Sequence, residues 1–140
     1  MTNKPYLSAL SARHLRFGWG SLLVFVVLGG VLEAMHGFKV DWYLSFGSET
    51  QRLMWRLAHA HGTLLSLVHV AFAFTVTRCF TEPRVASACL TGASIALPGG
   101  FLLGAFGGGG GDPGVGIALV PLGLLLMLIG VAACLRSLRA

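Results

Sequence analysis

Four long apolar stretches constrain this chain more than any other feature of its 140 residues. A helix needs about 20 mostly apolar residues to cross a hydrocarbon layer roughly 30 Å thick. Four segments meet this requirement, at residues 15–36, 53–77, 85–106 and 115–135. The sequence therefore predicts an all-α fold, in which residues 1–140 form a single domain of four antiparallel transmembrane helices packed as a bundle.

The composition agrees with a membrane protein. Hydrophobic residues make up 55% of the chain and charged residues 11%, whereas a soluble domain is typically about 25% charged. This hydrophobicity also excludes a disordered chain. The net charge is +5, but Lys and Arg are scattered through apolar sequence and form no basic face, so no binding to nucleic acid is expected.

The basic residues indicate the orientation in the membrane, because short cytoplasmic loops carry an excess of Lys and Arg. Seven of them fall near the two termini and in the second connection: Lys4, Arg13, Arg16, Arg78, Arg84, Arg136 and Arg139. The opposite side carries Lys39, Arg52 and Arg56 beside three acidic residues. We therefore expect a multi-pass protein of the inner membrane with both termini in the cytoplasm. His14, which stands beside Arg13, is expected to contact lipid headgroups.

Small residues recur at every fourth position along the third segment. The series is Ala88, Gly92, Ala96, Gly100, Gly104 and Gly108. Small residues let helix backbones approach closely in lipid, where no hydrophobic force drives helices together. We expect this face to pack against another helix, either in the same chain or in a partner, as in a homo-oligomer or a larger complex in the lipid bilayer.

Ionisable residues gather where the first segment ends and the second begins. Ionisable groups inside a span are costly and usually functional or paired. Glu33 and His36 end the first segment, and Arg56, His59 and His61 begin the second. Because a short connection joins two antiparallel helices, all five residues are expected at the outer end of one helix pair.

A polar stripe continues along the second segment. Trp55, His59, Gly62, Ser66, His69 and Ala73 follow one another at spacings of four and three. These spacings place them on one helix face, which is expected to look into the bundle. His61 lies roughly 200° around the helix from His59, and His69 lies about 15 Å deeper than His59.

These residues allow several interpretations. Haem b would need axial histidines, for which His36 with His59 or His61 has a suitable depth. A copper or zinc ion would use Glu33, His36 and either His59 or His61. The alternative is internal polar pairing, of Glu33 with Arg56, and of His59 and His69 with Ser66, backbone carbonyls or other helices. A proton path is a further possibility, since Glu33 and the histidines are titratable.

The order of short motifs is similar to that of a known family. The first segment carries Leu28-Gly29-Gly30 and ends at Met35-His36, the second runs from Trp55 to His61-Gly62-Thr63-Leu64-Leu65, and the fourth has Pro121-Leu122-Gly123 before Arg136 and Arg139. In these features the chain resembles small four-helix membrane proteins of bacteria and animals, which are catalogued as a domain of unknown function. The resemblance implies a fold and a membrane location, with no established activity or ligand. Glu33 stands where that family has a small residue.

The sequence favours a protein that is not an enzyme, because the serines within the spans lack a histidine backed by a carboxylate. We expect a small non-enzymatic inner-membrane protein that serves as a subunit or accessory factor of a membrane assembly. The alternative is a haem- or metal-binding redox or sensor module centred on Glu33, His36, His59 and His61. A channel or carrier ranks last, since the polar stripe ends below His69 except for two threonines.

Overall fold

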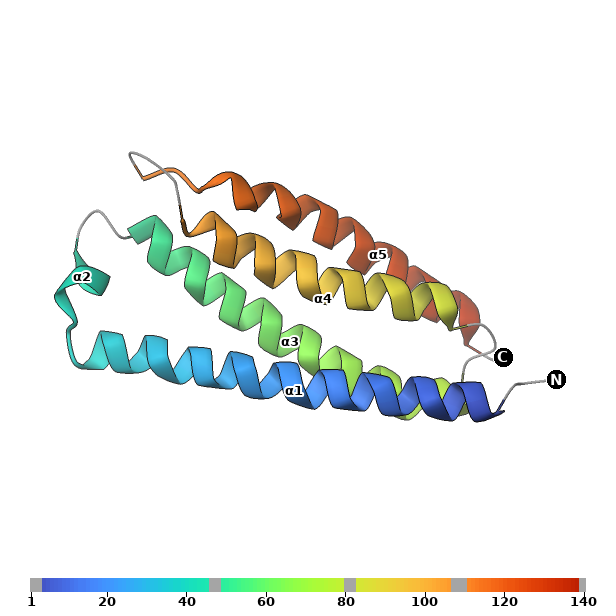
Figure 1. Ribbon diagram of the computed structural model, residues 1–140. Coiled ribbons are helices and arrows are strands. Elements are labelled where there is room, and N and C mark those ends of the chain that lie inside the picture. Colours follow the sequence, from blue (N-terminus) through green and yellow to red (C-terminus); the bar gives the residue numbers. More distant parts are fainter. Residues whose placement is uncertain (1–3, 46–48, 80–82, 107–110, 139–140) are drawn as a thin grey trace.

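The computed structural model describes residues 4–45, 49–79, 83–106 and 111–138. Its helical elements are α1 (Lys4–Gly37), α2 (Asp41–Leu44), α3 (Glu49–Cys79), α4 (Arg84–Gly104), the 3-10 turn η2 (Val115–Ala118) and α5 (Leu119–Ser137), all drawn in Figure 1. Four helical segments are long and apolar enough to span a membrane. The prediction of an all-α fold with four long apolar helices is therefore confirmed.

α1 extends well beyond the segment that hydropathy marks as a span. It has 34 residues, which corresponds to about 51 Å of helix and exceeds the ~30 Å hydrocarbon layer. The helix begins at Lys4 rather than near Leu15, so Arg13 and His14 belong to one continuous helix with the apolar residues that follow.

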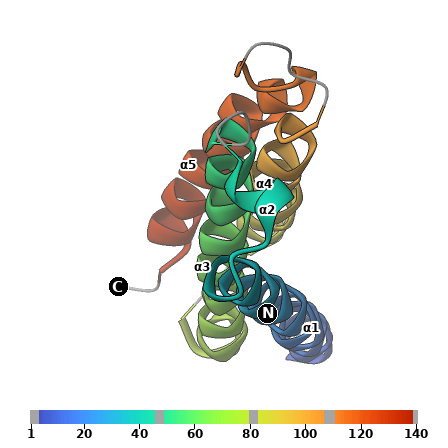
Figure 2. The same cartoon turned by 90° about the vertical axis from the view of Figure 1, so that its left-hand side faces the viewer.

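The long helices form an open row. α1 packs along α3, α3 along α4, and α4 along α5. The two outer members of the row, α1 and α5, lie apart from each other, as Figures 1 and 2 both show. The first turns of α1 and the last turns of α5 lie at one end of the molecule, and α2 lies at the other end.

Two clusters of buried apolar residues hold this row together. One joins α1, α3 and α4 and contains Leu7, Leu10, Phe72, Val76, Ala86 and Leu90. The other joins α3 and α4, close to α2, and contains Met54, Ala58, Leu65, Leu97, Phe101 and Ala105. The outward sides of α1 and α5 are apolar and exposed, for example Leu23 at 66% and Leu128 at 60%. Large exposed apolar surfaces of this kind are typical of membrane contact.

The small residues of α4 lie against the last helix of the same chain. A Cβ atom added at Gly100 would come within 2.9 Å of Val120, and one added at Gly92 within 3.0 Å of Leu126. Gly104 lies against Ile117 of η2. Ala96 is buried and Ala88 is exposed, and Gly108 lies outside the described residues. Close packing through small residues therefore occurs within the chain, between α4 and the η2–α5 segment.

Glycines also allow α1 and α3 to approach each other closely. An added Cβ at Gly18 would lie 3.0 Å from the carbonyl oxygen of Ser66. Added Cβ atoms at Gly29 and Gly62 would overlap the rings of His59 and Phe25 respectively. The contact at Gly29 brings the polar ring of His59 to the surface of α1, and the other two bring the backbones of α1 and α3 close together.

Candidate functional site

A pair of histidines lies inside the row of helices, one on α1 and one on α3. Nδ1 of His14 is 2.6 Å from Nδ1 of His69, and the rings stack with their centroids 4.8 Å apart. The exposed fractions are 1% for His14 and 0% for His69. The prediction that His14 contacts lipid headgroups is therefore wrong, because α1 turns this side chain toward α3 and α4.

Helix periodicity explains why the two histidines meet. The buried face of α1 follows Leu7, Leu10, His14 and Gly18, which are three or four residues apart and so share one side of the helix. On α3, Gly62, Ser66, His69 and Ala73 are all buried. The polar face predicted for this helix thus lies inside the structure.

Serines of α4 bond the outer nitrogens of the two rings. Nε2 of His14 is 2.8 Å from Oγ of Ser87, and Nε2 of His69 is 2.9 Å from Oγ of Ser94. Oγ of Ser87 also accepts a hydrogen bond of 2.7 Å from the guanidinium of Arg13. The network therefore ties α1, α3 and α4 together with side chains from each helix.

The bonds at Ser94 determine which nitrogen of His69 carries a proton. Oγ of Ser94 donates to the carbonyl oxygen of Leu90 at 2.9 Å, so it accepts from His69. A neutral histidine carries one N–H and one bare nitrogen. Neutral His69 therefore has its proton on Nε2 and accepts at Nδ1.

The same argument determines the tautomer of His14, and it makes the hydrogen bonds of the network run in one direction. His14 must donate from Nδ1 to the bare Nδ1 of His69, which leaves Nε2 of His14 as an acceptor for the hydroxyl of Ser87. Ser87 in turn accepts from Arg13. Every N–H and O–H group that takes part in these hydrogen bonds, from Arg13 to the carbonyl oxygen of Leu90, then has an acceptor, as buried polar groups require.

Aromatic rings enclose the histidine pair. The ring centroid of Phe17 lies 4.5 Å from that of His69, and the centroid of Phe72 lies 4.7 Å from that of His14. Apolar rings around a polar pair lower the local dielectric and strengthen its hydrogen bonds.

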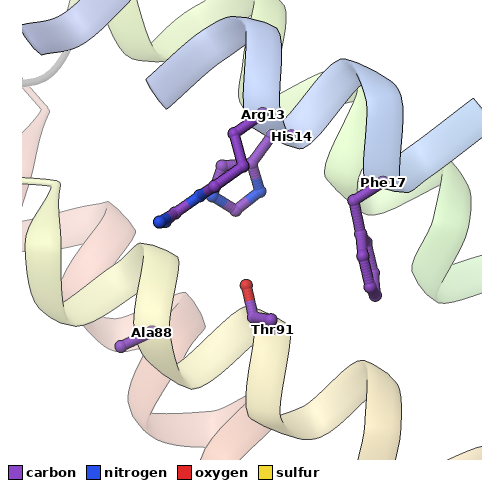
Figure 3. Close-up of a pocket in the computed structure, with 5 residues that line it drawn as sticks. All are labelled: Arg13, His14, Phe17, Ala88 and Thr91. Atoms are coloured by element: carbon purple, nitrogen blue, oxygen red, sulfur yellow. The ribbon is translucent and has the colours of Figure 1, made fainter. Parts of the chain in front are cut away.

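A cavity of about 340 Å³ opens beside this network. It is lined by Arg13, His14 and Phe17 of α1 and by Ala88 and Thr91 of α4. Figure 3 shows Arg13 and His14 reaching from α1 toward α4, with the hydroxyl of Thr91 directed back at α1. One histidine of the pair therefore has access to a space large enough for several water molecules, since one water occupies about 30 Å³ in the liquid.

Two further polar contacts join α1 and α3 along their interface. The hydroxyls of Ser21 and Ser66 are 2.7 Å apart, and Nδ1 of His59 lies 2.7 Å from the carbonyl oxygen of Phe25. Polar pairing was one interpretation of Ser66, His59 and His69. Each has such a partner, although the partner of His69 on α1 is His14, which the sequence did not indicate.

The residues predicted at the outer end of the helix pair are brought together in part. Glu33, His36, Arg56 and His59 line one cavity of about 360 Å³, together with Tyr43 of α2 and small or apolar residues of α1. His61 does not line it. Instead, Nδ1 of His61 bonds the carbonyl oxygen of Leu57 in its own helix, and its ring lies 4.9 Å from that of Phe101.

The geometry of this outer cavity limits what it can hold. Within the described part of the chain, no three His, Cys, Asp or Glu side chains are grouped so as to hold a metal ion. Glu33 and Arg56 line the same space, yet the ion pair found among the described residues joins Glu49 and Arg52 instead. The four ionisable side chains thus face a shared cavity without a direct bond between the two charges.

Comparison with family models, with curated proteins and with solved structures gave no match.

Proposed function

We propose that this chain is a small, non-enzymatic, multi-pass protein of the inner membrane that handles protons as a subunit or accessory factor of a membrane assembly. The observation that carries the proton-handling role is the buried pair of His14 and His69, bonded through their Nδ1 atoms. Ionisable groups within membrane helices commonly mark proton relays. The Lys and Arg distribution supports an orientation with both termini in the cytoplasm.

The chemistry of the pair follows from its hydrogen bonds. A proton that reaches His14, which lines the cavity, binds at Nε2 in place of the hydrogen bond from the hydroxyl of Ser87. The Nδ1 proton of His14 then moves to Nδ1 of His69, which becomes the cation. Beyond it, Ser94 leads only to the carbonyl oxygen of Leu90, which does not hold a proton. His69 is thus the storage position, and release follows the same bonds in reverse.

Nitrogen-15 NMR of the histidine-labelled protein in lipid tests this function, because it distinguishes both neutral tautomers from the cation. We expect His14 and His69 to take up one proton together as the pH is lowered from about 8 to about 3, a range that extends below that of exposed histidines because the pair is buried. If both rings stayed neutral, each in one tautomer, over the whole pH range, the pair would only stabilise the packing of the helices. That result would refute the proposal.

The assembly part of the proposal has a separate support and test. α5 of the same chain covers the small residues of α4, so a partner would contact the apolar outer sides of α1 and α5. We expect extraction in a mild detergent to yield a particle larger than the 14.7 kDa chain. Mass spectrometry of that particle shows whether it contains copies of this chain alone, as a homo-oligomer, or other proteins as well, as a larger complex. A monodisperse monomer with no companion protein would contradict this part while leaving the proton chemistry intact.

A further inference from the structure

The cavity near α2 offers a second site, on different side chains from the histidine pair. Its volume is about 360 Å³. α1 supplies Glu33 and His36, α3 supplies Arg56 and His59, and α2 supplies Tyr43. The cavity therefore lies where two long helices and the short α2 meet.

Both signs of charge face this cavity from opposite helices. Glu33 of α1 and Arg56 of α3 are exposed, and no ion pair joins them within the described part of the chain. A carboxylate accepts hydrogen bonds from an ammonium group, and a guanidinium donates to phosphate or carboxylate oxygens. A ligand that satisfies both side chains at once therefore carries an ammonium and an anionic group.

The neighbouring side chains give the cavity a fixed wall. His59 is held by its hydrogen bond to the carbonyl oxygen of Phe25 and lies against Gly29, where no side chain intervenes. Tyr43 is fully buried and stacks parallel to Trp55, with centroids 6.1 Å apart. These contacts define one side of the space, while the charged groups stand at its exposed side.

The depth of the site favours a lipid headgroup. Glu33 lies one helical turn before the end of α1 at Gly37, and so next to the edge of the apolar segment predicted over residues 15–36, where the headgroup region begins. We propose that this cavity binds a zwitterion in which an ammonium is joined to a phosphate, with phosphatidylethanolamine as its source. Glu33 accepts from the ammonium and Arg56 donates to the phosphate.

Lipid retention by the delipidated protein tests this proposal. The protein is mixed with micelles containing equal amounts of phosphatidylethanolamine and phosphatidylglycerol, and the bound lipid is identified by native mass spectrometry. We expect the wild type to retain phosphatidylethanolamine. Glu33→Gln should lower the preference over phosphatidylglycerol about tenfold, because one charge-assisted hydrogen bond is lost. Arg56→Gln should reduce retention of both lipids, since both carry the phosphate.

Matched controls separate the site from general charge effects. Lys39→Gln removes an exposed charge near the same helix end, outside the cavity lining, and should leave the preference unchanged. His14→Gln should also leave it unchanged, because the site is independent of the proposed proton handling. Competition by soluble glycerophosphoethanolamine would assign the ligand to a free headgroup instead of a lipid.

Three results would overturn the proposal. The first is equal retention of the two lipids by the wild type. The second is a preference that Glu33→Gln does not change, with circular dichroism showing that the variant is folded. The third is a Soret absorption band or stoichiometric copper or zinc in the purified protein that is lost with His36→Ala or His59→Ala. That result would assign the cavity to haem or metal.

Discussion

Substituting Gly18 by alanine tests how closely α1 and α3 approach each other. An added Cβ would lie 2.9 Å from Cγ2 of Val70, 3.0 Å from the carbonyl oxygen of Ser66 and 3.1 Å from the backbone nitrogen of Val70. Two of these three atoms belong to the backbone and cannot rotate away. Gly18→Ala therefore requires α1 to move away from α3, next to the histidine pair.

The expected change in stability combines two opposing effects. Overpacking a well-packed interface costs about 1–3 kcal/mol, whereas replacing glycine by alanine inside a helix contributes roughly 0.5–1 kcal/mol. The net effect for Gly18→Ala is a loss of about 1 kcal/mol. Gly20→Ala is the matched control on the same helix, because an added Cβ there meets nothing within 4 Å. It should gain about 0.5–1 kcal/mol.

The assay is reversible unfolding in mixed micelles of a mild detergent and dodecyl sulfate, followed by circular dichroism. The two variants should shift the unfolding free energy in opposite directions from the wild type. If Gly18→Ala were as stable as Gly20→Ala, α1 and α3 would not be in the close contact on which the histidine pair depends.

Three further predictions concern the tautomers, the topology and the outer site. Nitrogen-15 spectra of the neutral protein should show the proton of His14 on Nδ1 and that of His69 on Nε2, and the opposite assignment would reverse the hydrogen-bond chain. The topology can be tested in a variant without native cysteines. Asp112→Cys should react with a membrane-impermeant maleimide in intact cells, whereas Ser8→Cys should react only after the cells are permeabilised. The reverse pattern would mean that the termini lie outside the cytoplasm. His61→Ala should leave lipid retention at the outer cavity unchanged, since His61 bonds its own helix, and a loss of retention would place this ring in the site.

Hydropathy was sufficient to predict the long helices. Each one contains a window of residues apolar enough to cross a membrane, and segments of that kind must satisfy their backbone bonds internally as helices. The polar face of α3 could also be predicted from the sequence, because Ser66 and His69 interrupt an otherwise apolar segment at the spacing of one helix face. This spacing predicted a buried face before any partner helix was known.

The partner of His69 was not predicted, because the rotation of α1 is hard to read from its sequence. Apolar residues surround the central part of that helix, so they mark no single inward face. The informative signal lies earlier, where Leu7, Leu10, His14 and Gly18 follow the spacing of one helix side. A span that begins near Leu15 places Leu7, Leu10 and His14 outside the bundle, so hydropathy alone does not assign them to the buried face of α1.

The cavity near α2 shows a second reason why the sequence alone does not predict the geometry of a site. A short connection between two helices correctly indicated that Glu33 and Arg56 lie at one end of the molecule. Their distance depends on the rotation of each helix and on side-chain rotamers, which spacing along the sequence does not fix. For the same reason, His59 lines the cavity and His61 does not, although both stand at a similar depth.

The successive polar contacts between α1 and α3 oppose any sliding of one helix along the other. His14 meets His69, Ser21 meets Ser66, and the carbonyl of Phe25 meets His59. A shift of one helix along the other by one turn, about 5.4 Å, would separate all three pairs at once. In hydrocarbon the freed groups would find no water as a substitute. The two helices are thereby locked in one register, and a bilayer that thins or thickens must be accommodated by tilting the pair as a unit.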